Sequence, residues 1–239
     1  KNIYQMSKTL ISLIKMSNIR LQVLFEDNHL IAINKQSGDI IQGDKTGDEP
    51  LSEKVKKLLK KKYNKPGNVF LGTIHRIDRP TSGIIIFAKT SKALSRMNEK
   101  FRDNKISKIY WAIVKNNLPK KSGPLVNYLT KDQKKNKSFV TKNKEGKLAK
   151  LSYKLLNKLN NYYHYEIYPE TGRHHQIRVQ LSNMGSPIKG DLKYGAKRSN
   201  NDASINLHAR EIIFEHPVSK EEITIIAPTP NETIWNSIS

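Results

Sequence analysis

The segment from His75 to Gly83, with the sequence HRIDRPTSG, holds the densest group of side chains that could take part in chemistry. Asp78 stands between Arg76 and Arg79, and opposite charges so near in sequence favour the ionised form of its carboxyl group. An ionised carboxylate can act as a nucleophile or as a base near neutral pH. An ion-paired surface loop without a chemical role would have the same composition, so the residues alone leave both interpretations open.

A second segment, from Glu170 to Arg178 (ETGRHHQIR), combines basic and polar residues. We expect a helix with Thr171 as its N-cap, which continues through HHQIRVQLSNMG and ends at Gly185. If Arg178 is buried on this helix it needs a carboxylate partner, and Asp78 is the obvious candidate. An ordinary basic helix on a basic protein is the alternative.

Three other kinds of site have weaker support. His75, Asp78 and Ser82 contain the atoms of a hydrolase triad, but Ser82 does not lie in a G-x-S-x-G turn. Cysteine is absent and no histidine pair has H-x-x-x-H spacing, which argues against a metal site. The nucleotide-binding patterns G-x-x-x-x-G-K-[ST] and G-x-G-x-x-G do not occur in the sequence. We therefore expect neither a metal nor a cofactor.

The spacing of apolar residues predicts the elements that hold these segments. Runs on either side of Asp27-Asn28 predict a hairpin, and FLGTIH and GIIIFAKT predict strands that flank the Asp78 segment. Helices are expected over PLSEKVKKLLKKKY, SKALSRMNEKFRD and NETIWNSI, the last with Asn231 as its N-cap. Further strands are expected over KIYWAIVK, AKLSYKLL, YYHYEIYPE, SINLHAREIIFEHP and EITIIAP. The pattern predicts one mixed α+β domain in which antiparallel sheet dominates.

The N-terminal segment differs from the rest. Residues 1–20 are expected to be an extension, helical or loosely ordered, and residues 21–239 to be the folded domain. No run of 18 apolar residues occurs and no cleavage site follows the first segment, so neither a membrane span nor a secretory signal is predicted. The cytoplasm is the expected location.

The charge of the chain points to a polyanionic partner. In 239 residues, 43 Lys and Arg stand against 21 Asp and Glu, which gives a formal net charge of +22. Such an excess is typical of proteins that bind nucleic acid, with an anionic membrane as the second candidate. A genome composition rich in Lys and Asn would produce the same excess without a functional cause.

Three motifs in order, HRIDRPTSG, TGRHHQIRVQL and PIKGDLKYG, resemble the RluA-type family of RNA pseudouridine synthases. The resemblance extends from about Val23 to the APTP segment near the C-terminus. It implies the pseudouridine synthase fold, with a bent sheet flanked by helices. It also implies that specific uridines in ribosomal or transfer RNA are isomerised to pseudouridine after the base leaves its stack. Lys35-Gln36-Ser37-Gly38 lacks the proline usual in the family, and we expect this segment to lie outside the chemistry.

The resemblance assigns roles to individual residues. It implies that Asp78 is the catalytic carboxylate, that Tyr110 packs on the flipped base and that Arg178 pairs with Asp78. Arg76 takes the place of the flipped base, a role for which a planar guanidinium is suited. Contacts with RNA are also expected from Arg79, Arg173, His175 and Gln176, of which the last three either support the helix or touch phosphate.

A structured RNA is the expected partner, with no obligate protein partner and a monomeric chain. The lysine run at 54–62 and the segment 130–150 are the expected contributors to phosphate binding, and we expect the latter to be a mobile hairpin that orders on RNA. A non-catalytic RNA-binding or ribosome-assembly protein is the competing class, and hydrolytic removal of the base is a third option. Whether Asp78 attacks the sugar, attacks the base or removes a sugar proton stays open.

Overall fold

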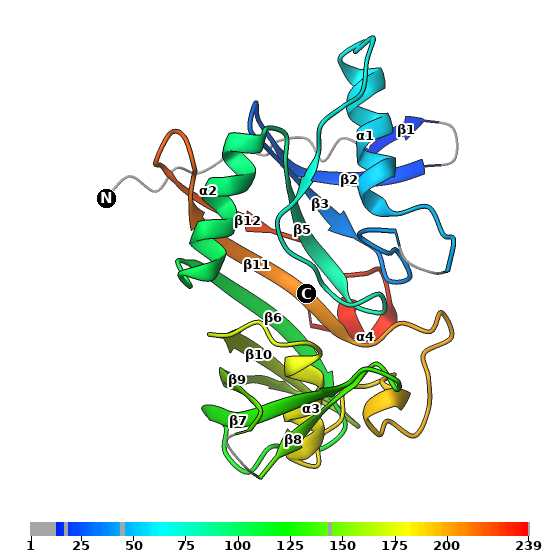
Figure 1. The fold of residues 1–239 in the computed structure, drawn as a ribbon. Coiled ribbons are helices and arrows are strands. Elements are labelled where there is room, and N and C mark those ends of the chain that lie inside the picture. The colour runs from blue at the N-terminus through cyan, green and yellow to red at the C-terminus, as the bar shows by residue number, and fades with distance from the viewer. Residues whose placement is uncertain (1–12, 17–18, 44–45, 143–144, 239) are drawn as a thin grey trace.

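A single twelve-stranded sheet forms the framework of the protein (Figure 1). The computed structural model describes all residues except 1–12, 17–18, 44–45, 143–144 and 239. The strand order is β1-β2-β3-β5-β11-β6-β10-β9-β7-β8, with β12 paired to β11 and β4 paired to β5. The strands are β1 (Leu13–Met16), β2 (Ile19–Glu26), β3 (Leu30–Lys35), β4 (Gly72–Thr73), β5 (Ser82–Ala88), β6 (Ile106–Val114), β7 (Ser122–Asp132), β8 (Lys137–Thr141), β9 (Lys147–Lys158), β10 (Tyr163–Pro169), β11 (Leu207–Glu215) and β12 (Glu222–Ile226).

Among the described strand pairs, β5 and β11 are parallel and the others are antiparallel. The helices are α1 (Leu51–Lys62), α2 (Ser91–Arg102), α3 (Gln176–Asn183) and α4 (Thr233–Asn236), with a 3₁₀ turn η1 at Leu192–Tyr194. This architecture confirms the predicted α+β fold on a largely antiparallel sheet.

Strand β5 is buried on both faces and holds the first half of the molecule together. Ile84 and Ile86 pack in a cluster with residues of α2, whereas Ile85 and Phe87 pack in a cluster with residues of α1. Because successive side chains of a strand point to opposite faces, α1 and α2 cover the two faces of this half (Figure 1). Helix α3 packs on the other half, against β6, β9 and β10.

The segment that carries Asp78 connects β4 to β5 and enters the sheet at Ser82, one residue before Gly83. A Cβ atom at Gly83 would lie 2.3 Å from the backbone oxygen of Ala209 on β11, and the φ of Gly83 is +113°. Only glycine tolerates both the conformation and the close approach. The final glycine of the HRIDRPTSG motif therefore lets β5 pair with β11 and fixes where the preceding loop ends.

Three expectations about helix and strand ends are wrong. Helix α3 begins at Gln176 and Thr171 is not its N-cap, because His175 has a φ of +54°, outside the right-handed helical region. Helix α4 has Glu232 and not Asn231 at its N-cap position. The strand expected over FLGTIH is limited to β4.

The structure describes only part of the N-terminal segment 1–20, for which a helical or loosely ordered extension was predicted. Residues 13–16 form strand β1, paired with residues 19–22 of β2, and are not helical as the spacing suggested. Residues 1–12 and 17–18 lie outside the described residues. No described helix is long and apolar enough to cross a membrane.

Candidate active site

A cleft of about 800 Å³ lies between the Asp78 loop and the turn that precedes α3. Its walls come from segments far apart in sequence: the loop before β5, strand β6, residues 171–178, the β7–β8 hairpin and η1. All the site residues expected from the sequence line it: Arg76, Asp78, Arg79, Tyr110, Arg173, His175, Gln176 and Arg178.

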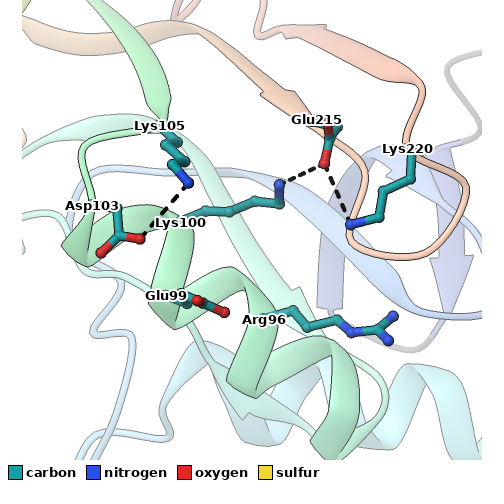
Figure 2. A pocket seen from close by; sticks show the side chains of 7 residues that line it. All are labelled: Arg96, Glu99, Lys100, Asp103, Lys105, Glu215 and Lys220. Carbon is teal, nitrogen blue, oxygen red and sulfur yellow. Dashed lines mark hydrogen bonds and ion pairs between the residues drawn. The ribbon is translucent and has the colours of Figure 1, made fainter.

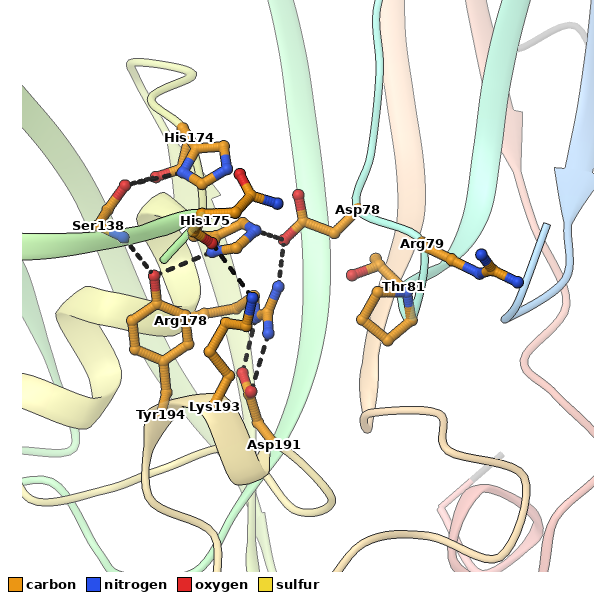
Figure 3. Close-up of polar contacts among 12 residues, drawn as sticks. Asp78, Arg79, Thr81, Ser138, His174, His175, Arg178, Asp191, Lys193 and Tyr194 are labelled. Atoms are coloured by element: carbon orange, nitrogen blue, oxygen red, sulfur yellow. Dashed lines mark hydrogen bonds and ion pairs between the residues drawn. The ribbon is translucent and has the colours of Figure 1, made fainter. Parts of the chain in front are cut away.

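Arg178 lies at the floor of the cleft between two carboxylates (Figure 3). Its Nη1 donates to Asp78 Oδ2 at 2.8 Å, while Nε and Nη2 donate to the two oxygens of Asp191 at 2.7 and 2.8 Å. Burial disfavours the charge, but the hydrogen bonds with Asp191 and the contacts with Asp78 outweigh it and raise the pKa of Arg178. The guanidinium is therefore a fixed cation held by two carboxylates.

The two carboxylate oxygens of Asp78 have different surroundings. Oδ2 accepts from Arg178 and faces His175 Nε2 at 3.6 Å, whereas Oδ1 has no hydrogen-bond partner among the described residues. The arginines next to Asp78 in sequence do not pair with it: Arg79 pairs with Asp48 at 2.7 Å, and Arg76 is exposed. The cation that faces Asp78 thus comes from α3, and Oδ1 can accept a further hydrogen bond.

Lys35 fixes the loop behind Asp78. The side chain is fully buried, and its ammonium group donates to the backbone oxygens of Gln36, Arg79 and Thr81 at 2.8, 3.0 and 2.8 Å. Burial lowers the pKa of Lys35 to about 8. Residues 35–38 do not line the cleft, but Lys35 holds the turn that carries Asp78 through these backbone contacts.

Tyr110 forms one wall of the cleft from strand β6. Burial raises the pKa of its phenol, and the charge of Asp78 adds to the rise, so the hydroxyl keeps its proton at neutral pH. A neutral aromatic ring beside an ion pair offers a flat apolar surface to a planar ligand.

Asp191 and Tyr194 lie beside Arg178, and neither was predicted as a site residue. Both residues belong to the PIKGDLKYG motif, so the family resemblance marked their segment without indicating a chemical role for either residue. The ring of Tyr194 lies against the guanidinium of Arg178, 5.0 Å from ring centre to Cζ. Tyr194 therefore supports the same cation that Asp191 binds.

Gln176 and Arg173 occupy different environments. The amide of Gln176 is buried, accepts from Thr171 Oγ1 at 2.7 Å and from the Arg173 backbone at 2.9 Å, and donates to the Lys150 backbone at 3.0 Å. These hydrogen bonds stabilise the turn before α3. Arg173 is exposed at the rim of the cleft, where a phosphate can reach it.

The alternative chemistries find no assembled site among the described residues. Ser82 Oγ bonds His208 Nδ1 at 2.8 Å, and His75 Nε2 accepts from the Ile86 backbone at 3.0 Å, so His75, Asp78 and Ser82 do not form a triad. In the described part of the chain, no group of three His, Cys, Asp or Glu side chains is placed to hold a metal ion.

A smaller hollow of about 310 Å³ lies between α2 and the β11–β12 turn (Figure 2). Five of its seven charged residues pair with one another: Glu215 contacts Lys100 at 2.8 Å and Lys220 at 3.5 Å, and Asp103 contacts Lys105 at 3.9 Å. This hollow contains none of the motif residues.

Comparisons with known proteins agree with the geometry. The sequence model of the RNA pseudouridylate synthase family matches residues 29–183. Ribosomal large subunit pseudouridine synthase C of Buchnera aphidicola (subspecies Acyrthosiphon pisum) is 36% identical over 220 residues, which cover 89% of this chain and 68% of that protein. The synthase C of Vibrio cholerae is 32% identical, covering 90% of this chain and 67% of that protein.

Solved structures show the same fold. Human RNA pseudouridylate synthase domain containing 4 superposes with a TM-score of 0.74 at 23% identity, covering 89% of this chain and 90% of that chain. The sequence relatives favour an enzyme over a non-catalytic RNA-binding protein. The chain belongs to the family of RNA pseudouridine synthases, isomerases that convert uridine in RNA to pseudouridine.

Proposed function

We propose that this enzyme modifies a uridine in the RNA of the large ribosomal subunit, with Asp78 as its catalytic carboxylate. The observation that carries the proposal is the Asp78–Arg178 ion pair at the floor of a cleft large enough for a nucleoside. The substrate class is supported by the relatives from Buchnera and Vibrio, which are named ribosomal large subunit pseudouridine synthases.

The reaction is an isomerisation, and its bonds balance without a co-reactant. The bond between N1 of uracil and C1′ of ribose breaks, a bond from C5 to C1′ forms, C5 loses a proton and N1 gains one. In each of the three roles open to Asp78, an oxygen that is not engaged elsewhere is required. Oδ1 meets this requirement, because Arg178 occupies Oδ2. Tyr110 supplies the flat wall against which a detached uracil can turn.

The target base must leave the RNA stack to reach this floor, and that costs a few kcal/mol. Arg76 is exposed at the mouth of the cleft and has no ion pair with a described residue, so its guanidinium is available to fill the vacated position. We further propose that the enzyme acts as a monomer, and we place its work in the cytoplasm with the ribosomal RNA.

The decisive experiment replaces Asp78 with Asn, which keeps the shape and removes the charge. We expect pseudouridine formation in large-subunit ribosomal RNA to fall at least about 10³-fold, with RNA affinity within about threefold of wild type. Pseudouridine is measured by chemical mapping and affinity by filter binding. Retained isomerisation in Asp78→Asn would refute the catalytic role, and free uracil with abasic RNA in the wild-type reaction would indicate hydrolysis.

A further inference from the structure

His175 occupies an unusual place beside the catalytic carboxylate. Its side chain is almost fully buried, its backbone lies in the left-handed region with φ of +54°, and its ring stacks on His174 at 3.7 Å. Nε2 faces Asp78 Oδ2 at 3.6 Å (Figure 3). A buried ring in a rarely adopted backbone conformation is costly to maintain, and such positions cluster at functional sites.

The hydrogen bonds of Tyr194 determine which nitrogen of His175 carries the proton. The backbone N–H of Ser138 on β8 donates to the Tyr194 hydroxyl at 2.8 Å, and that hydroxyl lies 2.9 Å from His175 Nδ1. Among the described residues Nδ1 is the only acceptor within reach of the Tyr194 hydroxyl hydrogen, so we assign this hydrogen to the bond with Nδ1. Nδ1 is then the acceptor of a neutral imidazole, and the hydrogen resides on Nε2, which faces Asp78.

The charged groups around the ring agree with a neutral histidine. His175 is surrounded by Asp78, Arg178, His174 and Lys193, and burial lowers its pKa to about 3, against the opposing effect of Asp78. Arg178 already supplies the cation for Asp78. A second cation is therefore not needed there, but a neutral donor is useful, because it fixes the orientation of the carboxylate.

We propose that His175 is a positioning residue for Asp78: its Nε2–H donates to Oδ2 in the complex with RNA and keeps Oδ1 directed at the nucleoside. The separation of 3.6 Å is too long for a hydrogen bond. Hydrogen bonds of active sites often tighten only when substrate is bound, and a shift of well under 1 Å closes this gap. The inference rests on the proposed catalytic role of Asp78.

Tyr194 and Ser138 have defined parts in this arrangement. Tyr194 sets the tautomer, and Ser138 holds Tyr194 through its backbone and also bonds His174 through Oγ, at 2.9 Å to Nδ1 and 2.8 Å to the backbone oxygen. Both histidines are thus anchored to β8, the strand of the lysine-rich hairpin. A movement of this hairpin on RNA would be transmitted to the ring beside Asp78.

Two substitutions of His175 separate positioning from scaffolding. Gln carries an amide N–H2 that reaches the place of Nε2, but it is poorly suited to positive φ. Asn tolerates positive φ better than most residues, but it ends near Nδ1 and offers no donor to Asp78. Positioning predicts that kcat falls modestly in His175→Gln and about 100-fold in His175→Asn, with RNA affinity within about threefold in both.

The opposite results would overturn the proposal. A scaffold role predicts that His175→Asn is at least as active as His175→Gln. A direct RNA contact predicts a weaker affinity with kcat retained at saturating RNA. Thermal unfolding of both variants accompanies the assay, so that a loss of folded protein is not counted as a loss of kcat.

Tyr194→Phe tests the tautomer without changing residue 175. The ring stays against Arg178 while the hydroxyl is lost, and we expect kcat to fall about tenfold in the wild-type background. In a His175→Gln background the same change should have little effect, because glutamine has no tautomer to fix. Equal effects in both backgrounds would refute the tautomer argument. Activity in Asp78→Asn would instead refute the proposed function, so the two failures are distinguishable.

Discussion

The floor and the rim of the cleft both carry many charged side chains. The charges at the floor form ion pairs, whereas three cations at the rim form none with a described residue. At the floor, Arg178 holds Asp78 and Asp191 through three hydrogen bonds of 2.7 to 2.8 Å. At the rim, Lys131, Arg173 and Lys193 are exposed and form no ion pair with any described carboxylate. A partnered buried charge fixes geometry, whereas an unpartnered exposed cation attracts phosphate. We therefore expect the same residue types to serve chemistry at the floor and RNA binding at the rim.

Helix α1 shows that lysine content alone does not mark an RNA surface. In its lysine run, Lys54 pairs with Asp39 at 2.6 Å, Lys57 with Glu49 at 2.6 Å and Lys62 with Glu26 at 2.7 Å. The lysines of the β7–β8 hairpin make no ion pair with a described residue. Of the two segments expected to bind phosphate, the structure thus favours the hairpin, and its ordering on RNA stays a prediction.

The largest effect at the floor is expected when Arg178, the cation shared by Asp78 and Asp191, is removed. Arg178→Met would leave Asp78 and the buried Asp191 without a counter-charge, which costs about 3–5 kcal/mol for a buried pair. We expect undetectable pseudouridine formation and a free energy of unfolding lowered by that amount in urea titrations. Arg178→Lys keeps the charge but cannot bridge both carboxylates, so it should be intermediate. Activity within tenfold of wild type in Arg178→Met would contradict the role of the floor.

The rim is tested by removing three cations that form no ion pair with a described residue, Lys131, Arg173 and Lys193, each replaced by Ala. Each phosphate contact adds about 0.7 to the slope of log affinity against log salt on single-stranded RNA. Three lost contacts should flatten the slope by about 2 and weaken binding about 100-fold at 0.1 M salt. Filter binding over a salt series measures both, and kcat at saturating RNA should stay within about threefold.

A matched control removes the same charge from α1. Lys54, Lys56 and Lys57, each replaced by Ala, change the net charge equally, but they form ion pairs in the fold. Because exposed pairs of this kind contribute about 0–1 kcal/mol each, the variant should fold, and its RNA affinity should change less than about fivefold. Equal losses in the two triple variants would mean that overall charge, and not the rim, determines binding.

Lys35 is a third kind of lysine, buried beneath the floor and bonded to three backbone oxygens. Lys35→Met should lower activity about tenfold and the free energy of unfolding by about 2 kcal/mol, since buried acceptors lose their donor.

The stability that Lys35 contributes should depend on pH. The pKa of Lys35 is about 8 in the folded protein and lies below the usual value near 10.4. Between these values the unfolded chain binds more protons, so the stability of wild type relative to Lys35→Met should rise with pH. We expect about 2 kcal/mol between pH 7.5 and 9.5 in urea titrations, and a flat difference would contradict the assignment.

Much of the fold could be predicted because helices and strands leave local periodic patterns. The amphipathic spacing of α1 and α2 and the apolar run of β5 were sufficient to place these elements. The turn before α3 was missed, because a histidine with positive φ has no signature in hydrophobic spacing. Strand β1 was missed because its apolar residues also fit a helical period, and pairing with β2 decides between the two.

The sequence by itself determined the family, the chemistry available at Asp78 and the expected pairing with Arg178, because three motifs in order carry this information locally. Only the tertiary structure decided which charges are partnered. Arg178 meets Asp78 across 100 residues of chain, and Lys35 meets Arg79 across 44. Coulombic and hydrogen-bond energies depend on distances in space, and the sheet sets those distances by joining β5, β11 and β6 beneath the cleft.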